Sequence, residues 1–440
     1  MPVSTRSFCP ATRIWLNVTS WPATCYPSCV VNASPSRVSI LRLSRFTFKL
    51  CYPSAANAVV LDAELTPFLM RQLHQFGVVN YLASSRLVIL RPKFLFWLFF
   101  YSLRAPRIAA NLAAYLKSSR IPILVTMDFL DIQLPSTQLR TSLLEEVSEL
   151  VATTEFISVQ HGQELRRFDL GNKHKRVTLL CFGAWVAENF PKYGRLESKY
   201  VPVGALINSL YLQARPNDIP KASPIVVLST VKDDSWWGLK IGERRAGYES
   251  LMSFVRRFCE KNSIRPLVAL TIDRDTNRNI DESTLERKWF LQRLGESVEF
   301  TDPQLLFGER VNMDGSSAEA RSVKERFATY YACDQSLITV GMSSTALWES
   351  FARGNRILAV NLTDNPIYDF PIQGLWSMRQ PTFTDFEARV QHIMQMTDDE
   401  WRDISDSARE FLVRANSSET VADRIRNHIA EVLSQHPWRK

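Results

Sequence analysis

The stretch from Leu337 to Thr363 constrains the fold of this chain more than any other. It contains a short apolar strand, a turn of hydroxyl residues, a helix and a second apolar strand. The helix is expected over Thr345–Ala352, and Gly354 follows it, as glycine commonly does just past a helix end. Two strands joined by a helix form a unit of a parallel sheet with helices on its faces. The segment therefore predicts an α/β domain.

The turn of this unit is a candidate anion-binding site. Ser343, Ser344 and Thr345 stand where the first backbone N–H groups of the helix lack an intrahelical partner and the helix dipole is positive. Their hydroxyl groups add donors for phosphate oxygens. Glu349 follows one turn later on the same face and could accept hydrogen bonds from a sugar or ribose diol. The spacing alone fits equally well a serine, Ser343, that only caps the helix.

Strands and helices alternate along the rest of the chain and predict two domains. The strands expected in the first part are 58–62, 121–126, 156–159, 177–182 and 200–203. Those expected in the second part are 225–230, 267–272 and 298–300, followed by the unit above and by terminal helices at 400–413 and 419–434. We therefore predict an α/β fold of two Rossmann-like parallel-sheet domains that face a cleft. The predicted boundaries are 57–213 and 225–440, with a Pro-rich linker at 214–224.

Three candidate site residues follow strands of the first domain, where ligands of parallel sheets gather. His161 ends an apolar strand, and its imidazole could take the proton of an attacking acceptor hydroxyl. Gly162 would let a substrate approach closely. Asp128 could orient His161 or bind acceptor hydroxyls, or it could cap the next helix. A histidine that is hydrogen-bonded to a neighbouring backbone group is the alternative for His161.

The second domain offers two cations just beyond its strands. Lys232 and Arg274 could neutralise a donor diphosphate, and each fits a solvated surface charge equally well. The chain has neither the Gly-x-x-x-x-Gly-Lys phosphate loop nor the Gly-x-Gly-x-x-Gly fingerprint. Residues 273–275 match the Asp-x-Asp pattern of metal-dependent sugar transferases only formally. We therefore expect no metal and no cofactor.

A longer segment, GMSSTALWESFARGNRILAVNLTDNPIYDF at 341–370, resembles the carboxyl-terminal half of GT-B glycosyltransferases. More narrowly, it is similar to a bacterial family of surface-carbohydrate transferase-like proteins that are distantly similar to CDP-glycerol glycerophosphotransferases. FISVQHG at 156–162 and VPVGALINS at 201–209 match as well. The resemblance spans the chain from residue 58 to its end.

The resemblance implies a role for each matching segment. The serine turn and Glu349 would line the site of a nucleotide-activated donor. Gln160, Gly162, Gly204 and Asn208 would lie on the interdomain or acceptor side. The expected activity is therefore transfer of a sugar from a nucleotide-activated donor to a surface polysaccharide or glycolipid acceptor. Transfer of a polyol phosphate from a CDP-linked donor, or a catalytically silent binding protein of the same fold, are the alternatives.

The net charge of +8 does not indicate a nucleic-acid partner. Six of these charges come from residues 1–56, which contain six Arg or Lys and no Asp or Glu, so the remainder of the chain is nearly neutral. This first segment is expected to be an extension, either an organellar transit peptide or sequence outside the folded domains. The seven cysteines suggest no disulfide framework, which favours a reducing, cytoplasmic location.

The run Phe94–Leu103, FLFWLFFYSL, is a weak membrane signal. It is ten residues long, whereas a membrane-spanning helix needs about 20. Lys93, Arg104 and Arg107 flank it, so it could lie on the inner face of a membrane with its bases on acidic headgroups. We favour a helix that packs within the first domain, with a break at Pro106.

Overall fold

The computed structural model describes residues 40–43, 46–49, 58–61, 79–80, 87–89, 92–126, 131–133, 140–160, 162, 176–193, 197, 199–230, 241–270, 280–301, 323, 327–415 and 418–435. Four of the candidate site residues lie outside these ranges, namely Asp128, His161, Lys232 and Arg274. The predicted roles of these four residues therefore stay predictions.

The carboxyl-terminal half contains a six-stranded sheet in which all neighbouring strands are parallel. The order is β14-β13-β12-β15-β16-β17, which is 3-2-1-4-5-6 when the strands are numbered along the chain, the order of the Rossmann fold. Its strands are β12 (Ser223–Leu228), β13 (Leu267–Ala269), β14 (Glu299–Thr301), β15 (Ser336–Gly341), β16 (Ile357–Asn361) and β17 (Ser377–Arg379). The predicted parallel sheet and its strand–helix–strand unit are confirmed.

The amino-terminal half contains a second six-stranded parallel sheet, with the order β11-β10-β9-β6-β3-β4. Numbered along the chain this order is 2-1-3-4-5-6, which extends the flavodoxin-like order by one strand. Its strands are β3 (Ala58–Leu61), β4 (Val79–Asn80), β6 (Ile123–Thr126), β9 (Glu155–Val159), β10 (Val177–Cys181) and β11 (Lys199–Pro202). Two small sheets pair β1 (Ile40–Leu43), β2 (Phe46–Lys49) and β5 (Leu87–Ile89), and β7 (Asp131–Gln133) with β8 (Arg140–Ser142).

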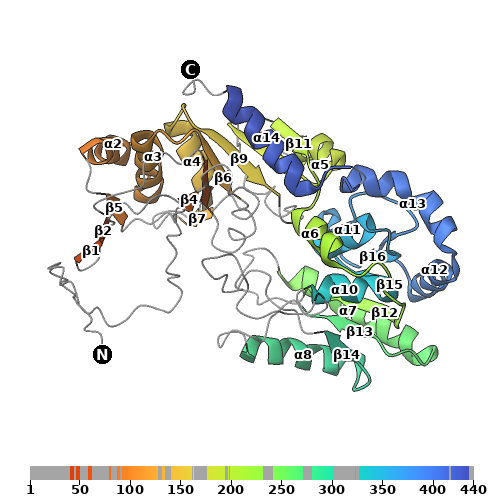
Figure 1. Cartoon of the computed structure of the whole chain (residues 1–440). Helices are drawn as coiled ribbons and strands as arrows, with labels where there is room; N and C mark the ends of the chain where they lie inside the picture. The colour runs from red at the N-terminus through yellow and green to blue at the C-terminus, as the bar shows by residue number, and fades with distance from the viewer. Residues whose placement is uncertain are drawn as a thin grey trace, which may run out of the picture.

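Helices cover both sheets (Figure 1). Those of the amino-terminal half are α2 (Pro92–Ser102), α3 (Arg107–Ser119), α4 (Leu143–Leu150), α5 (Ala184–Asn189) and α6 (Leu206–Ala214). Those that follow are α7 (Ile241–Lys261), α8 (Ile280–Leu294), α10 (Ala328–Asp334), α11 (Thr345–Ala352), α12 (Phe383–Gln395), α13 (Asp398–Leu412) and α14 (Val421–Gln435). Short 3-10 turns lie at Phe190–Tyr193 and Pro366–Tyr368.

The last helix returns to the amino-terminal sheet. Apolar residues of α14, including Ile425 and Ile429, share a buried cluster with Val125 of β6 and Val159 of β9. Figure 1 shows α14 in dark blue beside β11, away from the rest of the carboxyl-terminal half. The chain therefore crosses between the two sheets twice, at α6 and again between α13 and α14.

Backbone contacts hold the second crossing in place. The Arg414 N–H donates to the Phe182 carbonyl at 2.8 Å, just past the end of β10. The Arg414 guanidinium donates to the Pro202 carbonyl at 3.1 Å, at the end of β11. Gly204 lies beside this segment with φ +99°, a left-handed conformation that favours glycine. A Cβ at Gly204 would stand 2.5 Å from the Arg414 carbonyl oxygen.

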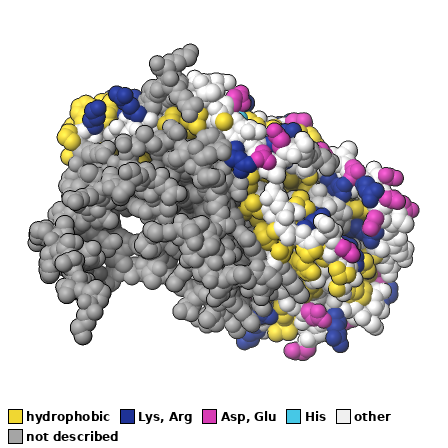
Figure 2. All heavy atoms as spheres, viewed as in Figure 1, with side chains coloured by type: hydrophobic (Ala, Val, Ile, Leu, Met, Phe, Trp, Pro, Cys, Tyr) yellow, Lys and Arg dark blue, Asp and Glu magenta, His cyan; other side chains and the backbone are white. Residues whose placement is uncertain are grey.

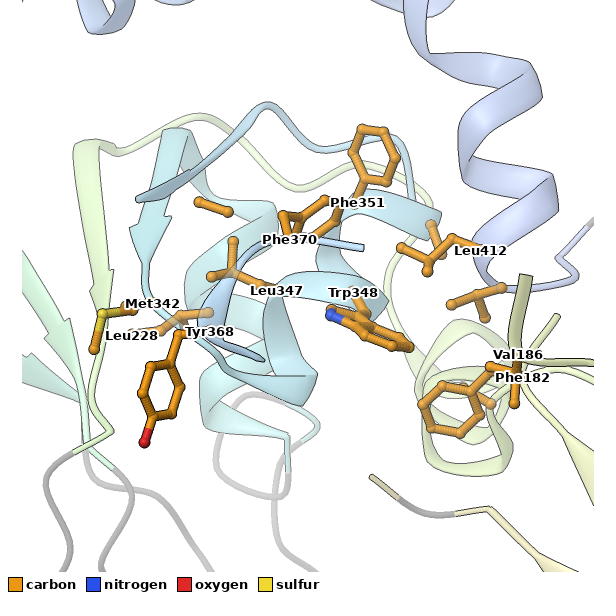
Figure 3. Close-up of a cluster of buried hydrophobic side chains, with 14 of the residues drawn as sticks. Phe182, Val186, Leu228, Met342, Leu347, Trp348, Phe351, Tyr368, Phe370 and Leu412 are labelled. Atoms are coloured by element: carbon orange, nitrogen blue, oxygen red, sulfur yellow. The ribbon is translucent and has the colours of Figure 1, made fainter. Parts of the chain in front are cut away.

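A cluster of apolar side chains around Trp185 and Trp348, called here the apolar joint, connects the two halves. Trp348 of α11 is buried, and its ring meets that of Trp185 of α5 edge to face, with 5.6 Å between the ring centroids. Figure 3 shows Phe182 and Val186 on one side of this joint and Leu412 above Trp348. Because these side chains belong to one continuous buried cluster, the two halves share part of their core.

We expect Gly204→Ala to lower the free energy of unfolding by about 2 kcal/mol or more. A side chain there would be forced against the Arg414 carbonyl in a backbone conformation that alanine rarely adopts. Urea unfolding monitored by tryptophan fluorescence measures the change. Gly242→Ala is the matched control, because a Cβ at Gly242 in α7 would meet nothing within 4 Å. The control should be neutral or stabilising by up to about 1 kcal/mol, and equal losses in both variants would contradict the steric argument.

Candidate functional site

The serine turn directly follows β15 and leads into α11. Ser343 has φ +49°, a left-handed conformation that is uncommon for a residue other than glycine. Ser344 is the N-cap residue, with extended backbone, and its side chain makes no capping hydrogen bond. The alternative of a simple capping serine therefore does not describe this turn, because the cap position is occupied by Ser344 and its hydroxyl is not used for capping.

The position of the turn in the sheet is the position where Rossmann-like sheets bind ligands. The strand order reverses between β12 and β15, because successive strands run outward from this pair in opposite directions. In open parallel sheets, ligands bind outside the carboxyl ends of the two strands at such a switch point. The turn Ser343–Thr345 follows the carboxyl end of β15 directly. The amino end of α11 thus belongs to the switch point of this sheet.

The amino-terminal sheet meets this turn from the other side. Gly162 follows β9, and a Cβ built on it would lie 3.5 Å from Thr345 Oγ1, which is ordinary van der Waals contact. The carboxyl end of β9 and the amino end of α11 are therefore neighbours, although Gly162 and Thr345 are far apart in sequence. The two segments that the sequence analysis singled out separately come together here.

Gln160 fixes the backbone of the turn that follows β9. Its side chain is buried, and its Nε2 donates to the Gly162 carbonyl at 2.8 Å. The Phe182 N–H donates to Gln160 Oε1, also at 2.8 Å. Both ends of the amide are therefore occupied within the protein, which makes Gln160 a positioning residue for the turn after β9.

Glu349 lies on α11, one turn beyond Thr345, and is 4% exposed. The Tyr330 hydroxyl donates to Glu349 Oε2 at 2.7 Å. Within the part of the chain that the structure describes, no donor reaches the second carboxylate oxygen, Oε1. Burial raises the pKa of Glu349 to about 7, against the opposing effects of the Tyr330 hydrogen bond and the Arg353 charge. The carboxyl group is thus poised to titrate near neutral pH.

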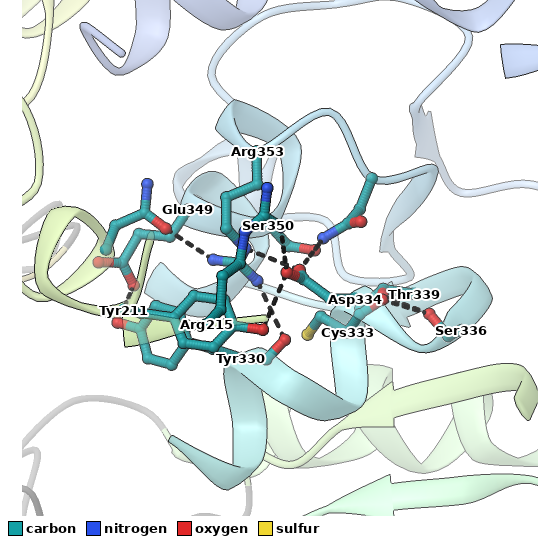
Figure 4. A network of polar contacts seen from close by, with 12 residues as sticks. Tyr211, Arg215, Tyr330, Cys333, Asp334, Ser336, Thr339, Glu349, Ser350 and Arg353 are labelled. Atoms are coloured by element: carbon teal, nitrogen blue, oxygen red, sulfur yellow. Dashed lines mark hydrogen bonds and ion pairs between the residues drawn. The ribbon is translucent and has the colours of Figure 1, made fainter. Parts of the chain in front are cut away.

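A buried ion pair supports this carboxyl group (Figure 4). Arg353 Nε donates to Asp334 Oδ1 at 2.8 Å, and both side chains are almost fully buried. Asp334 also accepts hydrogen bonds from Tyr211, Arg215 and Asn355, at 2.9, 2.6 and 2.6 Å. Burial opposes ionisation of Asp334, but the Arg353 charge and these hydrogen bonds outweigh it and hold its pKa at about 2. Asp334 is therefore a carboxylate at neutral pH.

The ion pair extends to the helix that crosses between the halves. Arg353 Nη1 donates to Asn208 Oδ1 of α6 at 2.7 Å, and Nη2 donates to the Tyr330 carbonyl at 3.4 Å. The expected interdomain position of Asn208 thus has a specific contact, and Arg353 connects α6 to the helix that carries Glu349. The sequence analysis did not single out Arg353. Its place four residues after Glu349 on the same helical face was an available signal.

Metal-ligand clusters are absent from the part of the chain that the structure describes: no three His, Cys, Asp or Glu side chains there are grouped so that they could hold a metal ion. The formal Asp-x-Asp match at 273–275 lies outside the described residues. The described face of the site consists of hydroxyl groups, helix N–H groups, one carboxyl group and a buried arginine.

The structure thus has two Rossmann-like sheets, which approach each other at the carboxyl ends of β9 and β15. The fold is GT-B-like. This confirms the predicted fold class and the family resemblance at the level of architecture.

The chain is similar to several solved structures, at low sequence identity and with TM-scores below 0.5. A glycosyltransferase from Rickettsia africae ESF-5 covers 86% of this chain and 98% of its own length, with 10% identity and a TM-score of 0.45. Anabaena Alr3699/HepE, in complex with UDP and glucose, covers 87% and 100%, with 11% identity and a TM-score of 0.45. The wall teichoic acid polymerase TagF covers 87% and 90%, with 7% identity and a TM-score of 0.44.

Sequence comparisons return nothing further. No protein-family model matches the chain, and no curated protein matches it. The function proposed below therefore rests on the site of this chain.

We expect Glu349→Gln to change the pH dependence of stability. The folded state, with a Glu349 pKa of about 7 against 4.5 for the ordinary group, binds more protons than the unfolded state between these pH values. The stability that Glu349 contributes is therefore complete below pH 4.5 and lost as the pH rises through 7. Glutamine cannot ionise, so the stability of the variant relative to the native protein should rise by up to about 3 kcal/mol from pH 4.5 to pH 8. Urea unfolding across this range measures it.

Tyr330→Phe is the companion variant. It removes the hydroxyl that favours the ionised form of Glu349, so the loss of stability should move to higher pH. Superimposable pH profiles for the native protein and Glu349→Gln would contradict the raised pKa.

Proposed function

We propose that this protein is a glycosyltransferase that moves a sugar from a nucleotide-activated donor to a surface glycan or a lipid-linked acceptor. The observation that carries the proposal is the coincidence of the serine turn with the switch point between β12 and β15. A switch point supplies the place for a nucleotide, and the positive amino end of a helix with adjacent hydroxyls supplies the chemistry for its phosphates.

The donor diphosphate would rest on the amino end of α11. The N–H groups there point out of the helix, and the hydroxyls of Ser343, Ser344 and Thr345 are beside them. Negative charge grows on the diphosphate as the bond to the sugar breaks, and fixed dipoles aimed at that charge stabilise it without reorganisation. Lys232 and Arg274 are proposed to add positive charge. With these groups in place, departure of the diphosphate needs no metal ion.

Glu349 is proposed to hold a diol of the donor. Its Oε2 is occupied by Tyr330, whereas Oε1 has no donor in the described residues and is left for a ligand. A carboxylate that accepts hydrogen bonds from hydroxyl groups is stabilised in its ionised form, so a bound diol would lower the pKa of Glu349 from its raised value. Donor binding would therefore release a proton near neutral pH.

The acceptor would approach from the amino-terminal half. Gly162 adjoins Thr345, so a group on the residue before Gly162 would be near the donor. We propose that this group, His161, is the base that takes the proton of the acceptor hydroxyl, and that Asp128 orients it. Such an enzyme would work on the cytoplasmic face of a membrane.

We expect one nucleotide among UDP, GDP, ADP, CDP and CMP to raise the melting temperature of the purified chain by about 2–5 °C at saturation. Ser344→Ala should reduce this shift, because it removes a hydroxyl that the fold does not use for capping. Ser250→Ala on α7 is the matched control, since Ser250 Oγ only donates to the Ala246 carbonyl. Stabilisation by CDP or CMP alone would favour polyol-phosphate transfer. No shift with any nucleotide would overturn the donor site and favour a silent scaffold.

We expect His161→Ala to abolish transfer and leave nucleotide binding intact. Loss of a general base typically costs about 10²–10⁴ in rate. Turnover is measured with the nucleotide-sugar that the thermal-shift screen identifies, and binding with the same thermal shift. A variant that keeps full activity would exclude His161 as the base, whereas one that loses the nucleotide shift would assign it to binding.

A further inference from the structure

Helix α2 presents a row of large apolar side chains to solvent. Phe96, Phe99 and Leu103 are 62%, 69% and 71% exposed, and Leu95 is exposed as well. The spacing of three or four residues places Phe96 and Phe99 on one side of α2, and Leu103, the first residue after the helix, continues the row. Seven large hydrophobic side chains are exposed in the described residues, and four of them lie within residues 95–103. Figure 2 shows this apolar patch with Lys or Arg side chains beside it.

The opposite side of α2 fixes the helix to the fold. Phe94 and Tyr101 are buried in the core of the amino-terminal half. Trp97 stacks on Tyr101 with 5.6 Å between ring centroids, and Lys117 of α3 lies over the Trp97 ring. The exposed row is therefore held on a packed helix and is not part of a loose segment. The break at Pro106 is confirmed, because α3 begins at Arg107.

The charged side chains within residues 92–120 are all cationic. Lys93 and Arg104 are exposed at its two ends, and the Arg104 guanidinium lies 4.0 Å from the centre of the Phe100 ring. Arg107 follows on the next turn. Residues 92–120 contain no Asp or Glu. An apolar face bordered by cations complements a surface that is apolar beneath and anionic outside.

The length of α2 excludes insertion across a bilayer. Its eleven residues extend about 16 Å, roughly half of the hydrocarbon thickness. Among the described residues, every helix is too short or too polar to cross a membrane. Contact of α2 with a membrane would therefore be along the surface and not across it.

We propose that the exposed face of α2 docks on an anionic phospholipid bilayer, with Phe96, Phe99 and Leu103 entering the boundary between headgroups and acyl chains. Lys93 and Arg104 then contact lipid phosphates. A second copy of this chain fits the face less well, because symmetric pairing would bring the same cations together without any carboxylate in 92–120 to neutralise them. The surface goes beyond the proposed transferase activity and does not depend on it.

Vesicle flotation of the full chain tests the proposal. We expect binding to phosphatidylcholine vesicles in which about a third of the lipid is phosphatidylglycerol. We expect only weak binding to vesicles of phosphatidylcholine alone. Phe96→Ser with Phe99→Ser should lower partitioning about tenfold or more, since each ring loses its apolar contact with lipid. Leu285→Ser is the matched control, because Leu285 is 64% exposed on α8, away from the patch. It should bind as the native chain does.

Three results would overturn the proposal. They are no binding to anionic vesicles, unchanged binding by the double Phe variant, or a native chain that is dimeric in light scattering while the double Phe variant is monomeric. Lys93→Glu with Arg104→Glu should also weaken binding, and added salt should weaken binding of the native chain. The nucleotide thermal shift is measured without vesicles. A double Phe variant that keeps this shift is folded, so failure of membrane docking is distinguishable from failure of the donor site.

Discussion

The buried ion pair between Asp334 and Arg353 is the interaction on which the arrangement of the site depends. Two charges removed from water are tolerated only when a partner and hydrogen bonds replace their hydration. Asp334 accepts hydrogen bonds from Tyr211 of α6, from Arg215 just after α6, and from Asn355. Arg353 also donates to Asn208 of α6. The pair and its hydrogen bonds therefore link α6, α10 and α11. The helix that crosses between the sheets and the helix at the switch point share this support.

The same arginine sets the electrostatics of the candidate donor site. Burial disfavours the charge on Glu349, whereas Arg353 and the Tyr330 hydroxyl favour it, and the balance leaves the pKa near 7. A carboxyl group without the arginine would be more strongly held in its neutral form. The network thus does more than fasten helices together, because it keeps Glu349 able to ionise in a place that excludes most water. On the amino-terminal side, Gln160 fixes the backbone at Gly162.

Local sequence patterns predicted the helices and strands better than they predicted which side chains these elements bury. The unit from β15 to β16 was predicted from its apolar runs and Gly354, which has φ +92° in the structure. The first two turns of helix α7, which begins at Ile241, are mostly polar and give no apolar signal in the sequence. The run Phe94–Leu103 shows the limit of periodicity. It is apolar on all sides, so the sequence favoured a packed helix, whereas the structure packs one side and exposes the other.

The sequence by itself determined two parallel α/β sheets, the strand-end positions of the serine turn and Gly162, and the place of Glu349 one turn into the following helix. These follow from apolar periodicity, turn residues and the rule that parallel strands end at a common edge. Only the tertiary structure decided that Gly162 adjoins Thr345, that α14 returns to the first sheet, and that Asp334 and Arg353 pair beneath Glu349. Such contacts join residues distant in the chain, and their energies come from burial and charge pairing, which no local pattern records.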